Sequence, residues 1–316
     1  MTSPSSGSWL VRWLRSIFSG RGAVIGIPYL WLLVFFLLPF LIVLKISVSE
    51  MENVTFNDVL TYKDGVVALS VKVSNYFFLL EDDLYLKTYL SSLKYAAFTT
   101  LLCLFIGYPF AYFMARAKST VQPALLMLVM LPFWTSFLLR IYAWKGLLSE
   151  NGWAFDLIAG TGLDHLLAAI GLIPAPGQLM NTPFSLVLGM TYCYLPFMIL
   201  PLYSNLAKMD LRLLEAATDL GATPWVAFWK VTVPLSKAGI IAGSMLVFIP
   251  CVGEFVIPEL LGGPQTLMIG RVLWDEFFSN NDWPMASTVA VVMVLLIIVP
   301  LAIFNKYQAE ATERRT

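Results

Sequence analysis

Charged residues are scarce in this sequence. Only 13% of its 316 residues are Asp, Glu, Lys or Arg, whereas 59% are hydrophobic and the mean hydropathy is +0.77. Soluble domains contain about 25% charged residues and about 45–50% apolar residues. The composition therefore excludes an ordinary soluble domain and is typical of a chain embedded in a membrane.

Residues that hold metals or carry out catalysis are equally scarce. The three cysteines, Cys103, Cys193 and Cys251, lie in apolar runs, and His165 is the single histidine. These numbers argue against a disulfide framework and against a Cys/His metal site. The sequence contains neither a GxxxxGK[ST] phosphate loop nor an HExxH motif. We therefore predict no catalytic residue, no metal and no cofactor in this chain, and we do not expect it to be an enzyme.

Long apolar runs are what the sequence does contain. A transmembrane helix needs about 20 mostly apolar residues. Pro183 ends a proline-interrupted stretch, so we place one span directly after that stretch. The predicted spans are residues 22–44, 95–115, 119–139, 183–206, 238–261 and 283–305. The predicted fold class is all-α, a polytopic membrane protein with six transmembrane helices.

The basic residues predict how these spans are oriented, because Lys and Arg concentrate in cytoplasmic segments. With both termini inside, the inside segments hold Arg12, Arg15, Arg21, Arg116, Lys118, Lys208, Arg212, Lys230, Lys237, Lys306, Arg314 and Arg315. We expect residues 1–21 to be a cytoplasmic segment with a short interfacial helix. We expect 22–305 to be the six-span domain with a cytoplasmic loop at 207–237, and 306–316 to be a cytoplasmic tail.

Three long connections are then external. The loop 48–88 is rich in acidic residues, and its role is left open. The connection 145–182 alternates Gly, Pro and apolar residues. The last one, 262–284, contains RVLWDEFFSNNDW, which is typical of an amphipathic surface helix.

The cytoplasmic loop contains the sequence EAATDLGATPWVAFWKVTVPL, which predicts two capped helices. Asp210 can cap a helix over 211–220, and Gly221 can supply the left-handed residue that ends it. Thr223 and the proline after it can begin a second helix that ends near Pro234. The apolar side chains of the second helix are Trp225, Val226, Phe228, Trp229 and Val231. Such a helix needs either a membrane surface or a protein partner.

The spacing in this loop resembles the EAA motif of ABC-importer permeases. Glu215, Ala216 and Ala217 are followed by Gly221 at the seventh position, and the loop closes on VTVP with Pro234. The resemblance implies the type I importer (MetI-like) architecture. It also implies that this loop is the coupling helix, which docks in a groove of a separate ATPase that binds and hydrolyses ATP. Glu215 would then pair with a basic group of the ATPase or cap within the loop.

Other stretches are similar to the polyamine-importer permeases within this family. These are LPFWTSFLLRIYAW (131–144), GEFVIPELLGGPQTLMIGRVLW (253–274) and DWPMASTVA (282–290), and the first span is most similar to the larger putrescine permease subunit. The resemblance covers 24–47 and 76–305. It implies a bacterial inner-membrane permease that transports putrescine or spermidine. The implied partners are a second homologous permease, two copies of the ATPase and a periplasmic polyamine-binding protein.

The residues themselves indicate a candidate cation path. Glu254 lies in the fifth span, where Pro250, Gly253 and Pro258 interrupt the helix, and an ionisable group inside a span is a functional-site hypothesis by default. Ammonium groups also favour aromatic faces. The aromatic candidates are Trp134, Tyr142, Trp144, Tyr192 and Tyr194.

Alternatives stay open for each of these readings. Glu254 could instead form a structural ion pair with Arg140, and aromatic residues near span ends often only anchor a helix at the interface. The chain could also be the permease of an importer for another small solute, or an ion-driven secondary transporter that works without an ATPase.

Overall fold

The computed structural model describes residues 20–52, 55–56, 60–63, 66–69 and 72–313. The interfacial helix predicted for 1–20 falls outside the described residues except for Gly20. The chain divides into two compact units, residues 1–77 with 282–291 and residues 78–281 with 292–316.

The first unit begins with a long apolar rod. The rod consists of α2 (Gly20–Leu32), the π-helical turn η1 (Leu33–Leu37) and α3 (Leu38–Ser47). Its part Val24–Ser47 is long and apolar enough to cross a membrane, which agrees with the first predicted span. At the end of the rod, the Ser47 hydroxyl donates to the Leu44 carbonyl at 2.8 Å, and the Thr288 hydroxyl donates to the Ser47 carbonyl at 3.1 Å.

Two small β-hairpins follow within the acidic loop. Strand β1 (Met51–Glu52) pairs antiparallel with β2 (Thr55–Phe56), and β3 (Leu60–Lys63) pairs antiparallel with β4 (Val66–Leu69). In the second hairpin Leu60 lies opposite Leu69 and Lys63 opposite Val66. The predicted all-α class therefore holds for the spans, while part of the loop is paired strand.

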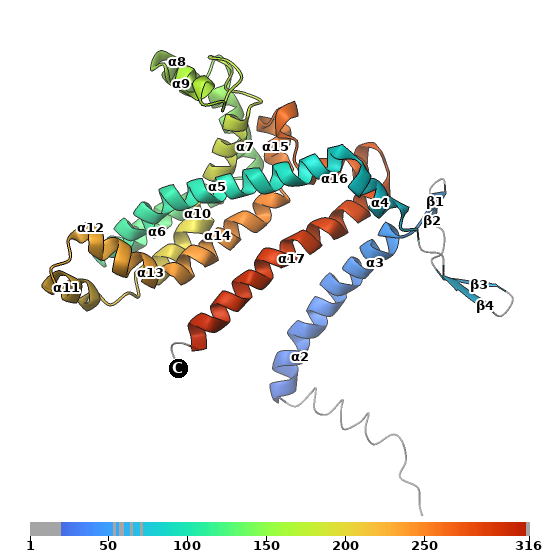
Figure 1. The fold of residues 1–316 in the computed structure, drawn as a ribbon, viewed down its shortest axis with the longest axis horizontal. Helices are drawn as coiled ribbons and strands as arrows, with labels where there is room; N and C mark the ends of the chain where they lie inside the picture. The colour runs from blue at the N-terminus through green and yellow to red at the C-terminus, as the bar shows by residue number, and fades with distance from the viewer. Residues whose placement is uncertain (1–19, 53–54, 57–59, 64–65, 70–71, 314–316) are drawn as a thin grey trace, which may run out of the picture. The chain divides into compact units, whose positions relative to one another are not determined.

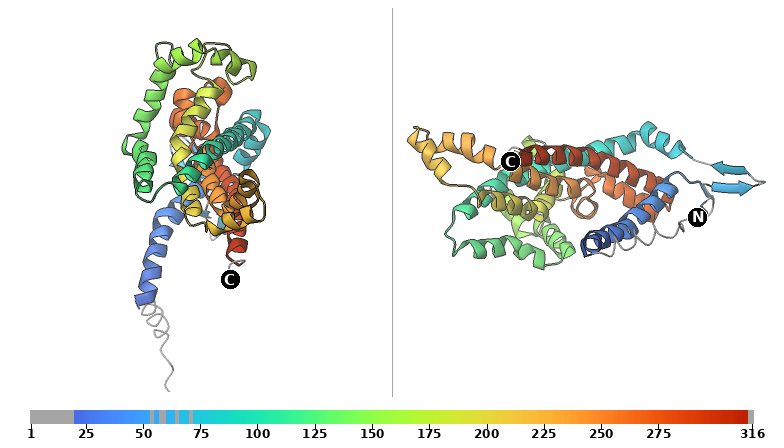
Figure 2. Two further views of the ribbon diagram at one scale, coloured as in Figure 1. Left: turned by 90° about the vertical axis from the view of Figure 1, so that its left-hand side faces the viewer. Right: turned by 90° about the horizontal axis from the view of Figure 1, so that it is seen from below.

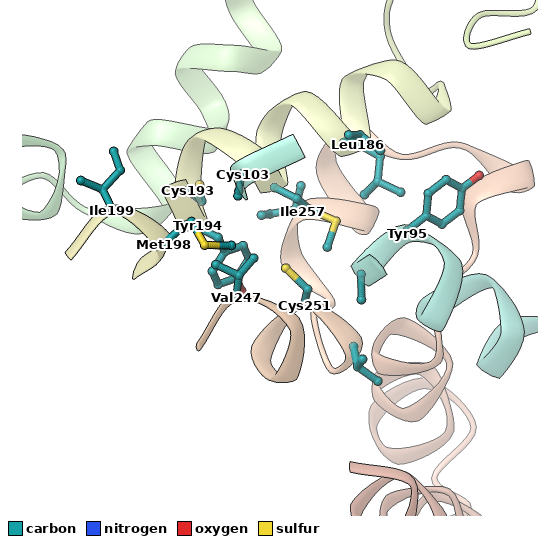
Figure 3. Close-up of a cluster of buried hydrophobic side chains, with 14 of the residues drawn as sticks. Tyr95, Cys103, Leu186, Cys193, Tyr194, Met198, Ile199, Val247, Cys251 and Ile257 are labelled. Atoms are coloured by element: carbon teal, nitrogen blue, oxygen red, sulfur yellow. The ribbon is translucent and has the colours of Figure 1, made fainter. Parts of the chain in front are cut away.

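The second unit is organised around three helices, which lie alongside one another in Figure 1 and Figure 2. They are α5 (Asp83–Arg116), α10 (Pro183–Leu206) and α14 (Lys237–Val252). The helix α4 (Ser74–Glu81) precedes α5. The three helices bury a continuous apolar core that includes Cys103, Cys193 and Cys251, all free thiols (Figure 3). The cysteines are therefore packing residues, as their apolar surroundings predicted.

Glycine lets two of these helices approach closely. A Cβ at Gly239 would lie 2.8 Å from the Asn205 Cβ, and one at Gly243 would lie 3.1 Å from the Met198 carbonyl oxygen. Gly239 and Gly243 are four residues apart and so lie on one face of α14, against α10. Small residues at such positions are typical of helix packing in membranes.

The third predicted span is bent rather than straight. Helix α6 (Gln122–Met130) and the 3-10 turn η2 (Leu131–Trp134) meet α7 (Phe137–Leu148) at 87°. Thr135 and Ser136 between them have ψ values of 151° and 137°, which are extended rather than helical. The Thr135 hydroxyl donates to the Pro132 carbonyl at 2.8 Å and so competes with helical pairing at the corner. The span predicted over 119–139 is therefore built from two helices with a bend between them.

Shorter helices connect and complete the second unit. Helices α8 (Trp153–Gly160) and α9 (Leu163–Ala169) pack beside a small cluster formed by Leu148, Ile173 and Leu179. After α14 come α15 (Val256–Leu261), the turn η4 (Pro264–Thr266), α16 (Ile269–Trp274) and the π-helical turn η5 (Asp275–Ser279). The last two form the helix that the RVLWDEFF pattern predicted.

The final helix, α17 (Trp283–Glu313), runs on past residue 305, so most of the predicted tail continues the last span as helix. Four helices of the described residues are long and apolar enough to cross a membrane. The number rises to six if each of the two bent pairs counts as one span, which agrees with the six predicted.

Candidate functional site

The predicted two-helix loop is present, and its caps form as the sequence indicated. Helix α11 (Arg212–Asp219) starts where the Asp210 carboxylate accepts a hydrogen bond from the Arg212 backbone N–H at 3.0 Å. The Arg212 side chain, which also binds this carboxylate, holds the pKa of Asp210 below its ordinary value. This start is exposed and depends on local chemistry alone.

The turn between the two helices is a Schellman motif. Gly221 adopts φ +81°, its N–H donates to Thr218 O at 2.9 Å, and the Ala222 N–H donates to Ala217 O at 3.0 Å. These are the two bonds that close a helix on a left-handed glycine. Thr223 then accepts from Val226 N at 3.4 Å and so begins the second helix.

The second helix is continuous up to Leu235. It consists of α12 (Pro224–Ala227), the π-helical turn η3 (Phe228–Thr232) and α13 (Val233–Leu235). The predicted end of this helix was near Pro234. In the structure Pro234 lies inside the last turn, one residue before the helix ends at Leu235. The chain then turns by 64° into α14. We call residues 210–235 the hairpin; Figure 1 shows α11–α13 at one end of the second unit and α8–α9 at another.

One face of the hairpin packs on α5, which was not predicted. The Phe228 ring makes edge contacts with Tyr108 (centroids 5.6 Å apart) and Tyr112 (5.8 Å apart). The Tyr108 hydroxyl also forms a 2.8 Å hydrogen bond with the Ser236 hydroxyl, which is at the turn into α14. The hairpin is thus fixed to the end of two core helices rather than hanging from a flexible loop.

The other face of the hairpin is exposed and apolar. Leu220 is 89% exposed, Trp225 69% and Trp229 52%, and the two indole rings contact each other with centroids 5.8 Å apart. Glu215 and Ala216 are exposed on α11, and Ala217 is half-buried. Exposed aromatic residues next to a small-residue surface are typical of a docking site for another protein.

Glu254 lies where the fifth span breaks. Helix α14 ends at Val252 and α15 begins at Val256, so the break covers residues 253–255. Of the three residues predicted to interrupt the helix, Gly253 lies in the break. Pro250 lies within α14 and Pro258 within the first turn of α15, so the two prolines do not interrupt a helix. A proline in a first turn is tolerated because its missing N–H would have no intrahelical partner there.

The Glu254 carboxylate is buried, and both of its oxygens accept hydrogen bonds. Its Oε1 accepts from the backbone N–H groups of Phe255 (3.1 Å), Val256 (3.0 Å) and Ile257 (3.4 Å). Its Oε2 accepts from the Tyr194 hydroxyl of α10. A helix N-terminus stabilises negative charge, so this arrangement places a fixed carboxylate at a break inside the apolar core.

The alternative partner predicted for Glu254 does not bind it. Nε and Nη1 of Arg140 are buried and have no hydrogen-bond partner within the described part of the chain. The guanidinium instead lies over the rings of Phe133 (5.3 Å) and Phe137 (5.6 Å). The predicted Glu254–Arg140 ion pair is therefore absent from this structure.

The aromatic candidates separate into three groups. Tyr194 is buried and contacts Glu254, as described above. Tyr192 packs edge-on against Trp144 with centroids 5.5 Å apart, away from that contact. Trp134 is 69% exposed and Tyr142 54% exposed. The structure thus pairs four of the six candidate path residues, Glu254 with Tyr194 and Tyr192 with Trp144, and leaves Trp134 and Tyr142 exposed.

Two phenylalanines that we did not predict extend this contact. Phe197 lies beside Tyr194 on α10 (centroids 6.1 Å apart), and Phe133 of η2 packs edge-on against Phe197 (5.2 Å). We call Tyr194, Phe197 and Phe133 the aromatic row; it runs from the Glu254 carboxylate to the Arg140 guanidinium. The spacing of Tyr194 and Phe197, three residues apart on one helix face, was a usable signal, whereas Phe133 belongs to a separate element, η2.

Comparison with known proteins gives the class of this chain. A model of the family described as "Binding-protein-dependent transport system inner membrane component" matches residues 104–313. The chain belongs to this family. It is thus a multi-pass inner-membrane component of a transport system and not an enzyme.

The curated relatives are more specific. The chain is 39% identical to the spermidine/putrescine transport system permease protein PotB of Haemophilus influenzae over 285 residues, which are 90% of this chain and 92% of that protein. It is 39% identical to PotB of Escherichia coli K12 over 273 residues, 85% of this chain and 92% of that protein. These relatives show the polyamine-permease family, but they do not distinguish the larger putrescine permease subunit from the other permeases of that family.

A solved structure confirms the fold. A chain of a bacterial ABC transporter involved in the import of the acidic polysaccharide alginate superposes with a TM-score of 0.61. The superposition covers 95% of this chain and 98% of that chain, at 14% sequence identity. The predicted importer-permease architecture is therefore correct.

Proposed function

We propose that this chain is a transmembrane permease subunit of an ATP-driven polyamine importer, with putrescine as the first candidate substrate. The observation that carries the proposal is the 39% identity to spermidine/putrescine permeases along nine-tenths of the chain. In an importer of this kind, the permease forms half of the translocation path and partner subunits bind and hydrolyse ATP. The predicted division into a cytoplasmic segment, a six-span domain and a cytoplasmic tail belongs to the same proposal.

The hairpin is the element that we propose to couple transport to ATP hydrolysis. Its exposed indoles and Leu220 offer an apolar face, and Glu215 offers a charge beside the small residues of α11. Its other face packs on α5 through Phe228, and the chain continues from the end of the hairpin directly into α14. A partner that moved the exposed face would therefore move α14 and α5 with it. The coupling residues proposed are Glu215, Ala216, Ala217, Gly221 and Pro234.

The complete importer then requires several partners. We propose two copies of the ATPase, a second homologous permease that completes the path, and a periplasmic polyamine-binding protein. The ATPases would lie against the hairpin, which places both termini and the hairpin in the cytoplasm, in agreement with the distribution of Lys and Arg.

Glu254 is the residue that we propose to bind the cation inside the path. Its carboxylate is held by the N-terminus of α15 and by Tyr194, so it offers a fixed negative charge at a helix break. An ammonium group would gain both this charge and the neighbouring ring faces, each worth about 0.5–2 kcal/mol. Trp134, Tyr142 and Tyr192 stay predictions for other stages of the path.

Reconstitution tests the proposed function directly. The chain, its partner permease and the ATPase are incorporated into liposomes, and uptake of labelled putrescine is measured with the binding protein outside and ATP inside. We expect uptake only when all components and ATP are present, and we expect spermidine to compete. Uptake by the permeases alone, driven by an ion gradient, would instead identify a secondary transporter. Uptake of another solute but not of polyamines would identify an importer of a different substrate class.

A further inference from the structure

Arg140 is a charged residue that the proposed function does not use. It lies on α7 just after the 87° bend, and two of its guanidinium nitrogens are buried without a partner in the described chain. Buried donors without an acceptor are costly, and a cation among apolar helices is more costly still. The guanidinium lies over the faces of Phe133 and Phe137.

The aromatic row connects this cation to the carboxylate. Phe133, under the guanidinium, packs against Phe197, which packs against Tyr194, which donates to Glu254. The row is open at its middle, because Phe197 is 37% exposed while Tyr194 is buried. A linear molecule could therefore lie along the row.

A linear diamine is chemically complementary to the two ends of the row, which are a carboxylate beside a phenol and an aromatic face that already holds a cation. One ammonium group would lie at Glu254 and Tyr194, the methylene chain would lie on Phe197, and the second ammonium group would lie on Phe133. The Phe133 position is where the guanidinium of Arg140 lies now. Cation–π contacts alone are worth about 0.5–2 kcal/mol, so a second cation can displace this one.

We propose that Arg140 is a resident cation of the substrate path, which occupies the place of the second ammonium group of a linear diamine and competes for it. The inference rests on the proposed function. When the path is empty, the guanidinium balances the charge of Glu254 across the row. When a diamine enters, it displaces the guanidinium, and the return of the guanidinium helps the diamine to leave.

The chain contains a matched control for Arg140. Arg116 lies over one ring, that of Tyr112 at 5.2 Å, and like Arg140 it has two buried nitrogens without a partner within the described residues. It is at the end of α5, and Glu254 has no part in its contacts. Arg116→Met therefore removes the same chemistry from a place where no diamine is expected.

The test is equilibrium binding of labelled putrescine to the assembled complex in nanodiscs, without the binding protein. We expect Arg140→Met to bind putrescine about fivefold more tightly, because the competing cation is gone, and to transport it more slowly in liposomes. Arg116→Met should bind putrescine with the same affinity as the complex with native residues.

With n-butylamine, which has one ammonium group, Arg140→Met should show no such gain in affinity. In a Glu254→Gln background, Arg140→Met should add nothing, and Glu254→Gln itself should impair uptake while the complex still assembles.

Other results would overturn the proposal. These are equal putrescine affinity in Arg140→Met and Arg116→Met, an equal gain with n-butylamine, or a gain that persists in Glu254→Gln. Arg140→Gln is the second neutral variant; if neither neutral variant assembles while Arg140→Lys does, Arg140 has a structural role and the proposal is wrong. A complex with native residues that neither binds nor imports putrescine would reject the proposed function itself. Normal import with an unaffected Arg140→Met would reject only this inference.

Discussion

The hairpin and the break at Glu254 solve the same local problem in opposite surroundings. In both places a helix ends and another begins, and a polar side chain satisfies the free backbone N–H groups of the new helix. Thr223 does so at the surface, next to exposed indoles, whereas Glu254 does so in the buried core with a tyrosine from another helix. A cap at the surface shapes one element, but a buried charged cap holds two helices together.

The consequence is a division of roles. The hairpin keeps its shape by local bonds, so its outer face is free to bind a partner. The break keeps its shape by contacts from α10, so a change at Glu254 is felt through the core. Substitutions that weaken the same kind of bond should therefore have different effects in the two regions.

The largest difference is expected for removal of the two glutamates. Glu254→Ala leaves the N–H groups of Phe255, Val256 and Ile257 and the Tyr194 hydroxyl without their acceptor, and we expect a loss of about 3 kcal/mol or more in stability. Glu215→Ala changes an exposed side chain and should leave stability unaltered. The melting temperatures of the two purified complexes measure this difference. Equal melting temperatures would mean that the Glu254 contacts contribute nothing to the core.

A smaller difference is expected when one hydrogen bond is removed in each region. Tyr194→Phe removes the donor to Glu254, and Thr223→Ala removes the acceptor for Val226 N; each bond is worth about 1 kcal/mol. We expect Tyr194→Phe to lower the melting temperature of the complex. Thr223→Ala should leave it unchanged but increase protease cleavage near residues 221–226, because only the hairpin opens. Increased cleavage in Tyr194→Phe alone would reverse the assignment of the two roles.

The parts of the molecule that were predictable from the sequence are those with local causes. Asp210, Gly221, Thr223 and the proline after it determine the hairpin through their own backbone neighbours, and all appeared where predicted. The same holds for the long apolar spans, because length and composition suffice to indicate them.

The parts that were not predictable depend on packing between distant segments. Phe133 of η2 meets Phe197 of α10, and Arg140, on the other side of the bend, lies over Phe133 at the end of the aromatic row. Phe228 was counted among the apolar side chains that need a membrane surface or a protein partner, but it packs on α5 of the same chain. Glu254 was recognised as unusual because it is an ionisable residue in a span. Its hydrogen bonds to backbone N–H groups depend on a break at residues 253–255. The positions of Pro250 and Pro258 did not predict where that break begins and ends.

The most direct test of the account is the number of putrescine molecules imported per ATP hydrolysed. Gly221→Pro removes the N–H that binds Thr218 O and forces a φ of +81° on a residue that cannot adopt it, and Glu215→Lys reverses the exposed charge. Gly162→Pro, at φ +72° in the turn before α9, makes the same backbone change at the other end of the unit and is the control. We predict that both hairpin variants assemble and hydrolyse ATP but import about tenfold less putrescine per ATP, whereas Gly162→Pro does not differ from the native chain. Unchanged import per ATP in both hairpin variants would contradict the coupling role of the hairpin.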